Sequence, residues 1–143
     1  RLDRGREAAD LSFDEGFAAW NRGDPLAAHE AFEAAWRETP PGDRRTLLHA
    51  LAQLGAVGHK LVSGVRVGGA AAVLARARVK LESLPDEVEG VDVPLLLEVA
   101  ERLSETLRAR VEGAASAPPV TLPSLGSRRP RGGRSLPDGP RGR

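Results

Sequence analysis

The apolar residues of the first 112 positions recur with the spacing of an α-helix, and this period constrains the fold more than any other feature. Leu47, Leu51 and Leu54, for example, share one face of a predicted helix over residues 43–63. Gly and Pro interrupt the period several times, and no stretch alternates apolar and polar residues as a half-buried strand does. The sequence therefore predicts an all-α fold, a compact bundle of about five antiparallel helices built on two αα-hairpins.

Signals for helix ends place these helices along the chain. The capping box Ser12-Phe13-Asp14-Glu15 predicts the start of the first helix, which ends at Asn21-Arg22-Gly23. The other helices are expected over about residues 25–38, 43–63, 69–84 and 94–111, with an acidic loop over residues 86–92. Residues 1–11 are then an N-terminal extension, residues 12–112 the helical domain, and residues 113–143 a disordered tail rich in Pro, Gly and Arg.

Composition limits the compartment and the kind of site. The absence of cysteine rules out disulfides and thiolate metal sites, and it fits a reducing compartment. The most apolar stretch, residues 46–62, carries His49, Gln53, His59 and Lys60, which a membrane-spanning helix would not tolerate. We therefore expect a soluble, cytoplasmic protein without a membrane partner.

The predicted tail differs in charge from the rest of the chain. Acidic side chains outnumber basic ones before Gly113, whereas the tail carries several Arg residues and a single carboxylate, Asp138. An Arg-rich run over residues 127–134 can contact nucleic acid weakly through counterion release, but it lacks interleaved aromatic residues that stack on bases. We expect a solvated tail and no nucleic-acid binding beyond such a weak contact.

The stretch from His29 to Trp36 carries the most chemistry in the chain. On a helix, His29, Phe32, Glu33 and Trp36 fall within about one third of a turn. Ionisable groups on an apolar face must be paired with each other or serve a site, because an unpaired buried polar group costs about 1–3 kcal/mol. His29 and Glu33 are four residues apart, so their side chains can hydrogen-bond or bind one cation jointly.

His59 is the best candidate for a third ligand. It lies beside Ala52, Gly55 and Ala56 on the predicted third helix, and these small residues let another helix approach closely. Two imidazoles and a carboxylate suit zinc or a similar divalent metal and can leave a position open for water. Metal-bound water would then be the nucleophile of a hydrolytic reaction, with Glu30 as the base.

Further side chains are expected to support this pocket. Gln53 lies at the border of its apolar stripe, where it can orient a ligand or a bound water. Trp20, Phe32 and Trp36 supply apolar bulk, although the helical spacing of both Trp residues favours a role in core packing. His49 turns to another side of its helix, and we expect it to be exposed.

The same residues allow a noncatalytic interpretation. The His29–Glu33 pair is then a structural hydrogen bond that fixes the packing of the first hairpin. The turn at residues 21–24, between two amphipathic helices, is typical of a helical protein-interaction module, although no repeat of about 34 residues continues. Exposed apolar shoulders on a short bundle would favour a homodimer. The sequence leaves the metal site and the interaction module open, and with them the question of catalysis.

Three spaced motifs, taken in order, resemble a known family. They are residues 17–24 around the Asn-Arg-Gly turn, residues 29–36 with the pattern His-Glu-x-x-Glu-x-x-Trp, and His59 followed by Gly64 and Gly69-Ala70. Together they resemble the small helical family catalogued as domain of unknown function 309, over about residues 13–84.

The resemblance implies a compact all-α fold. Metal-dependent hydrolysis has been suggested for such proteins, but no activity is established for the family. It also points to the residues singled out above, namely His29, Glu30, Glu33, Trp36 and His59. The chain departs from the family pattern at Val65, where Asn usually follows the Gly.

Overall fold

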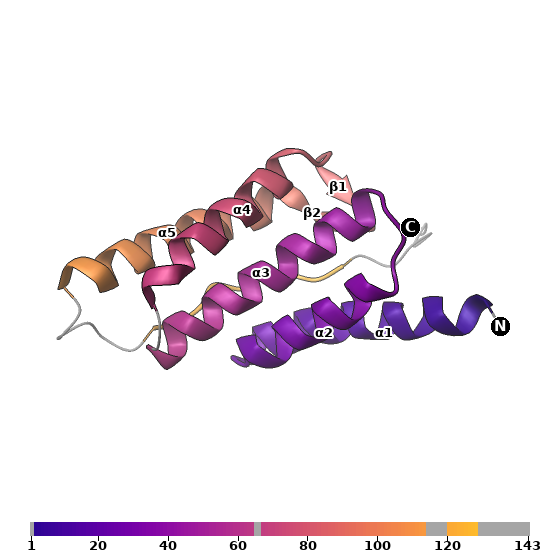
Figure 1. Ribbon diagram of the computed structural model, residues 1–143, viewed down its shortest axis with the longest axis horizontal. Coiled ribbons are helices and arrows are strands. Elements are labelled where there is room, and N and C mark those ends of the chain that lie inside the picture. The colour runs from indigo at the N-terminus through magenta and orange to yellow at the C-terminus, as the bar shows by residue number, and fades with distance from the viewer. Residues whose placement is uncertain (1, 65–66, 114–119, 129–143) are drawn as a thin grey trace, which may run out of the picture.

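Five long helices form the molecule, whose computed structural model describes residues 2–64, 67–113 and 120–128 (Figure 1). In chain order the elements are α1 (Leu2–Asn21), α2 (Pro25–Arg37), α3 (Asp43–Ser63), the short 3₁₀ helix η1 (Val67–Gly69), α4 (Ala70–Glu82), β1 (Glu87–Val88), β2 (Val91–Asp92) and α5 (Val93–Gly113). The predicted all-α fold is confirmed. Among the described residues, no helix combines the length and the apolar character needed to cross a membrane.

Helix α3 forms the centre of the bundle, with α1 and α2 on one side and α4 and α5 on the other (Figure 1). This position explains the composition of α3, because a helix covered on two sides must be apolar around most of its circumference. Ten of its residues are buried, among them Leu47, Leu51, Leu54 and Leu61, each with no exposed surface.

The turn between α1 and α2 follows the predicted helix signals. Asp24 accepts a hydrogen bond from the backbone N–H of Ala27 at 3.1 Å, and Pro25 occupies the first helical position. Phe32 of α2 packs edge to face on Phe13 and Phe17 of α1, with 5.3 Å between the ring centres of Phe17 and Phe32. The aromatic part of the core therefore lies between α1 and α2.

Helix α1 begins ten residues earlier than the capping box predicts. Ser12 lies inside the helix, and the predicted extension over residues 1–11 is helical from Leu2 onward. Ala9 is buried, and Asp10 forms an ion pair with Arg44 at 2.6 Å. A capping box cannot start a helix where upstream residues with high helix propensity already continue it and tertiary contacts hold it.

The acidic loop contains a two-stranded hairpin that the sequence analysis did not predict. Val88 pairs with Val91, and both side chains are buried. The turn residues Glu89 and Gly90 both have positive φ, at 53° and 78°, which is the conformation of a tight two-residue hairpin turn. The acidic side chains around these two Val residues leave each strand only two residues long, too short for an alternating pattern that would predict it.

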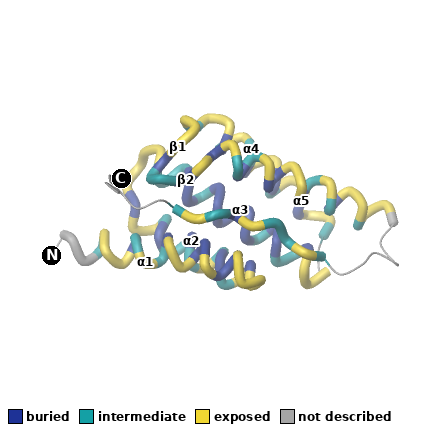
Figure 2. The backbone as a smooth tube through the Cα atoms, turned by 180° about the vertical axis from the view of Figure 1, so that it is seen from behind, coloured by how far each residue is buried: buried dark blue, intermediate teal, exposed yellow. Residues whose placement is uncertain are grey.

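The segment 120–128, hereafter the tail segment, lies within the part of the chain predicted to be a disordered tail, and the structure describes it in contact with the bundle. It runs in an extended conformation along the back of the bundle, over α3 and between the two helix layers (Figure 2). Leu125 is 2% exposed, so this part of the tail is packed against the helices. The other predicted tail residues, 114–119 and 129–143, lie outside the described residues. The composition of the tail gave no signal for these contacts, because they depend on one Leu side chain and a few backbone groups.

Candidate functional site

His29 is held by a hydrogen bond to the neighbouring helix. Its Nδ1 lies 2.8 Å from the carbonyl oxygen of Ala52 on α3, and a carbonyl oxygen can only accept. Nδ1 therefore donates this hydrogen bond, and Nε2 is the ring nitrogen that could bind a cation. Nε2 lies 3.9 Å from Oε1 of Glu33, as the spacing of four residues predicts.

Glu33 contacts two side chains of its own helix. Its Oε1 also accepts from Arg37 at 3.1 Å, one turn further along α2. The side chains of His29 and Glu33 are 29% and 37% exposed, so the pair lies at the rim of the helix interface rather than in the core. Water can reach both groups at this rim.

Gly55 allows the approach that orients His29. A Cβ atom at this position would lie 2.8 Å from the backbone nitrogen and Cα of His29, too close for any side chain. The absence of a side chain lets α2 and α3 pack closely enough for His29 to reach Ala52. The expectation that small residues on α3 admit another helix is consistent with this geometry.

The same packing register separates His59 from Glu33. Gly55 faces His29, and Gly58 faces Pro25, so α2 and α3 run antiparallel. His59 is therefore level with the start of α2, about 12 Å along the axis from the level of Glu33. Within residues 2–64, 67–113 and 120–128, no three His, Asp or Glu side chains form a group that could hold a metal ion. The structure brings His29 and Glu33 together but not His59, so a complete three-ligand centre is not observed.

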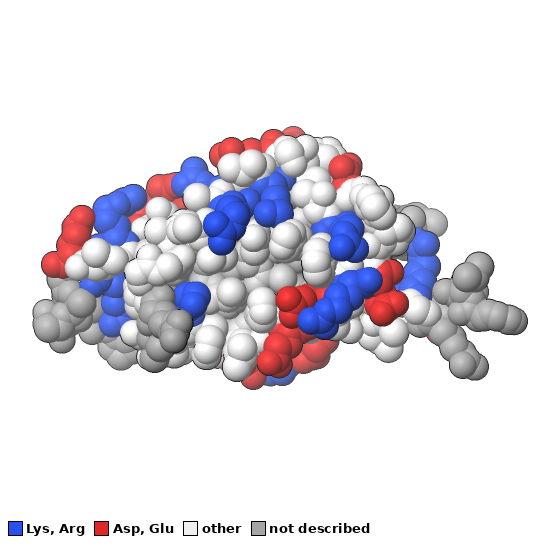
Figure 3. Space-filling model, in the orientation of Figure 1, with Lys and Arg blue, Asp and Glu red and all other residues white. Residues whose placement is uncertain are grey.

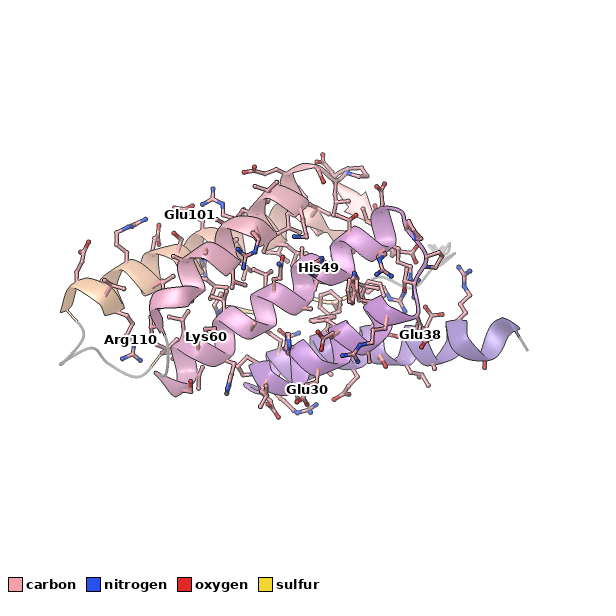
Figure 4. The ribbon with its side chains drawn as sticks, in the orientation of Figure 1. Glu30, Glu38, His49, Lys60, Glu101 and Arg110 are labelled. Atoms are coloured by element: carbon pink, nitrogen blue, oxygen red, sulfur yellow. The ribbon has the colours of Figure 1, made fainter. Side chains whose placement is uncertain are left out.

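The remaining predicted site residues have different surroundings. Glu30 is exposed, on the side of α2 away from α3 (Figure 4). Phe32 is fully buried between α1 and α2, where it packs on other Phe rings. Gln53 is half-buried, and its Oε1 has no hydrogen-bond partner within the part of the chain that the structure describes. The departure noted at Val65 lies outside the described residues.

His49 is not exposed as predicted but lies half-buried against Trp36. The two ring centres are 4.9 Å apart with the planes tilted by 30°, and Figure 4 shows His49 on the middle of α3. The guanidinium of Arg45 lies 4.3 Å from the centre of the Trp36 ring and donates to the carbonyl oxygens of Trp36 and Thr39. Arg45 thus caps the C-terminal end of α2. The spacing of Arg45 and His49, four residues apart, was the available signal for this cluster.

Positive charge gathers beside His49. Burial, followed by the charges of Lys80 and Arg45, lowers the pKa of His49 below its ordinary value, while Glu33 acts in the opposite direction. Burial and the charge of Arg76 likewise lower the pKa of Lys80. Figure 3 shows several separate groups of Lys and Arg side chains on the face that Figure 1 presents, with acidic side chains toward both ends and along the upper edge.

A second candidate site, which sequence reasoning missed, holds the tail segment. We call this surface, on α1 and α5, the tail groove; the side chains that contact the segment are Asp10, Phe13, Asp14, Trp20, Asn21 and Leu95. The indole N–H of Trp20 donates to the carbonyl oxygen of Pro123 at 2.7 Å. Trp20, predicted as a supporting residue of a metal pocket, is 1% exposed and contributes its polar edge to this groove.

Asn21 both donates a hydrogen bond to the backbone of the tail segment and accepts one from it. Its Nδ2 donates to the carbonyl oxygen of Gly126 at 2.8 Å, and its Oδ1 accepts from the backbone N–H of Leu125 at 2.9 Å. One side-chain amide thereby satisfies a donor and an acceptor of the extended chain. The same Oδ1 also accepts from the hydroxyl of Ser124 at 3.3 Å.

Arg128 binds at the far end of the groove. Its Nε and NH2 donate to the two carboxylate oxygens of Asp14 at 3.0 and 3.2 Å, and its guanidinium lies 4.5 Å from the centre of the Phe13 ring. The side chain is 11% exposed. Asp10 is nearby, and although burial alone would raise its pKa, the hydrogen bond and charge of Arg44, with the charge of Arg128, lower it.

The fold and these two sites define a small helical-bundle domain with polar groups at helix interfaces. Residues 13–72 match the model of the family described as Domain of unknown function (DUF309), which confirms the resemblance seen in the motifs. The match spans most of α1, all of α2 and α3, and the start of α4. Searches among curated proteins and among solved structures found no match.

Proposed function

We propose that this protein is a noncatalytic helical interaction module whose binding site is the tail groove. The observation that carries this proposal is the pair of hydrogen bonds from Asn21 to the backbone of Leu125 and Gly126. An extended peptide leaves its backbone groups unpaired, and a groove that supplies partners for them can bind it. The indole N–H of Trp20 supplies a further donor two residues before Leu125, to the carbonyl oxygen of Pro123.

In this proposal His29 has a structural role. Its hydrogen bond to Ala52 fixes α2 on α3, and α2 in turn supports α1, which carries Trp20 and Asn21. A binding surface on a rigid element loses less conformational entropy when a ligand binds. The polar groups of the first hairpin then serve to hold the groove in shape.

The test uses the full chain with its own tail segment weakened by Leu125→Ala and Arg128→Ala. A fluorescent peptide with the natural sequence of residues 120–128 should bind this variant saturably, as measured by fluorescence anisotropy. The same variant with Asn21→Ala added should lose most of the binding, because the backbone then has no partner at the centre of the groove. Circular dichroism checks that both variants stay folded. Absence of saturable binding to the folded first variant would overturn the proposal.

A divalent-metal site is the second candidate function, and one observation favours it. Nε2 of His29 and Oε1 of Glu33 are two acceptor atoms that face each other at 3.9 Å, an arrangement that a cation between them stabilises. Metal–ligand distances of about 2.0–2.2 Å allow one zinc ion to contact both atoms. The bond from Nδ1 to Ala52 is the kind of contact that orients a metal-binding imidazole. Hydrolysis with Glu30 as the base would require this ion.

Metal analysis of the purified protein, after growth with added zinc, manganese and iron, tests this second candidate. The wild type should contain bound metal, and His29→Ala should lose it. Arg37→Ala is the control, since it removes the other cation beside Glu33 without removing a metal ligand. Wild-type protein without metal under all three supplements would exclude the site.

A further inference from the structure

We infer that the tail groove selects peptides with the pattern Leu-Gly-x-Arg, and that residues 125–128 of the chain itself act as an intramolecular competitor of a partner protein with this pattern. The inference rests on the proposed function, and it adds the ligand sequence and the regulation of the site. Three residues of the tail segment carry it, namely Leu125, Gly126 and Arg128, together with the short connection from α5 to the segment.

The first position requires a large apolar residue. Leu125 is 2% exposed, whereas the neighbouring Ser124 and Ser127 are exposed. A buried Leu side chain contributes about 1.5–3 kcal/mol by removal of its surface from water. A smaller residue would leave part of this space empty, so the groove discriminates by size at Leu125.

The second position requires glycine for two independent reasons. Gly126 has a φ of +74°, a left-handed conformation that L-residues adopt at a cost of about 1–2 kcal/mol. A Cβ atom there would also lie 3.0 Å from Cδ2 of Leu95 on α5. The carbonyl oxygen that Asn21 binds belongs to this same residue, so the turn and the backbone contact depend on each other.

The fourth position requires arginine rather than any cation. Arg128 makes two parallel hydrogen bonds to Asp14 and places its planar group over the Phe13 ring. A lysine can supply the charge, but it cannot supply the paired donors or the flat stacking surface.

Negative charge remains in the groove when the segment leaves. Arg44 already pairs with Asp10 at 2.6 Å and with Glu89 at 2.8 Å, on the same side as Arg128. Arg128 is the cation that binds both carboxylate oxygens of Asp14. An empty groove therefore presents the Asp14 carboxylate beside the Phe13 ring, a surface that attracts a guanidinium group.

The tether makes the chain's own segment a strong competitor. Six residues, 114–119, join the end of α5 to the tail segment, so the segment stays near the groove at a high effective concentration. A partner must displace it, and its apparent affinity for the wild type is reduced by the fraction of molecules in which the groove is occupied.

The experiment compares labelled peptides of residues 120–128 on the full-length Leu125→Ala, Arg128→Ala variant. Relative to the natural peptide, alanine at Leu125 should weaken binding about 30-fold. L-alanine at Gly126 should weaken it about 10-fold, whereas D-alanine, which favours positive φ, should bind within about threefold. Citrulline at Arg128, which keeps the shape and removes the charge, should weaken binding about 10-fold. Alanine at the exposed Ser127 is the matched control and should have little effect.

Two further measurements complete the test. Adding Asp14→Asn to the variant should reduce its preference for arginine over citrulline, because the paired carboxylate is lost while Asp10 and Glu89 remain 3.6 and 3.9 Å from the guanidinium. The wild-type chain should bind the natural peptide at least about 10-fold more weakly than the variant, because its own segment competes.

The outcomes separate the two proposals. No binding of any peptide would overturn the proposed function itself. Equal binding of the natural and substituted peptides would overturn the Leu-Gly-x-Arg pattern and leave the groove as a nonselective peptide site. Equal affinities of wild type and variant would overturn the competitor role. A wild-type dimer that Leu125→Ala and Arg128→Ala convert to a monomer in sedimentation would show exchange of tails between copies, which overturns the intramolecular arrangement.

Discussion

The α2–α3 face and the tail groove both use polar side chains at a helix interface, but they differ in where the partners come from. On the α2–α3 face, His29 contacts Glu33 on its own helix and Ala52 on the next one. In the tail groove, Trp20 and Asn21 bind residues more than one hundred positions away. The comparison shows that spacing within one helix identifies side chains that share a face, whereas a site completed by a distant segment has no local signal.

The largest expected effect distinguishes the two tryptophans, one in each region. Trp20→Ala removes a fully buried indole and should lower the free energy of unfolding by about 3–5 kcal/mol, whereas Trp36→Ala, at a half-buried position, should cost about 1–2 kcal/mol. Urea denaturation followed by circular dichroism measures both. Equal losses would show that the α2–α3 face is as tightly packed as the core beneath the tail groove.

The next effect tests the close approach on the α2–α3 face. Gly55→Ala places a Cβ atom against the backbone of His29, so α2 must shift and the free energy of unfolding should fall by about 1–3 kcal/mol. Gly68→Ala is the matched control, because a Cβ atom at Gly68 would have no neighbour within 4 Å among the described residues, and the free energy of unfolding should stay within about 0.5 kcal/mol of the wild type. Thermal and urea denaturation measure the free energy of unfolding of both variants. A Gly55→Ala variant as stable as the wild type would contradict the close approach of α2 to α3.

A smaller difference is expected between the ionic contacts of the two regions. Arg128→Ala should lower the free energy of unfolding by about 1 kcal/mol, since the lost guanidinium is mostly buried, doubly bonded and stacked on Phe13. Glu33→Gln affects a more exposed pair and should change it by less than about 0.5 kcal/mol. Denaturation in low and high salt provides the measurement. A larger loss for Glu33→Gln would reverse the assignment of the stabilising contact.

The smallest effect is a pH dependence of the free energy of unfolding, which arises from His49 on the α2–α3 face. The pKa of His49 is lowered in the folded state by burial and by Lys80 and Arg45, against the opposing charge of Glu33. The unfolded chain therefore binds more protons below the ordinary imidazole pKa of about 6.5, so stability is complete above that pH and falls as the pH drops toward the folded value. His49→Gln should flatten this part of the stability profile. An NMR titration of the His49 ring that gave a raised pKa would contradict the expectation.

The sequence predicted the helices well because each is bounded by residues with strong local preferences. Pro25 after Asp24 marks the start of α2, and the helix α3 begins and ends where the breakers predicted. The predicted start of α1 was wrong because a local cap signal at Ser12 was outweighed by upstream helix formers and by the contact of Asp10 with Arg44.

The candidate site was predictable only in part. The juxtaposition of His29 and Glu33 follows from helical spacing alone. The level of His59 depends on the register of α2 against α3, which Gly55 and Gly58 determine through packing that a single sequence does not reveal. The exposure of His49 was mispredicted because Trp36, on another helix, covers it.

The connection between the first helix and the tail segment has a consequence for synthesis of the protein. Trp20 and Asn21 emerge early from the ribosome, but the residues that bind them are made about one hundred positions later. Until then the nascent chain carries these two side chains without the backbone groups that they bind in the folded protein. Any polypeptide that binds there at this stage, a chaperone included, meets no competition from the tail.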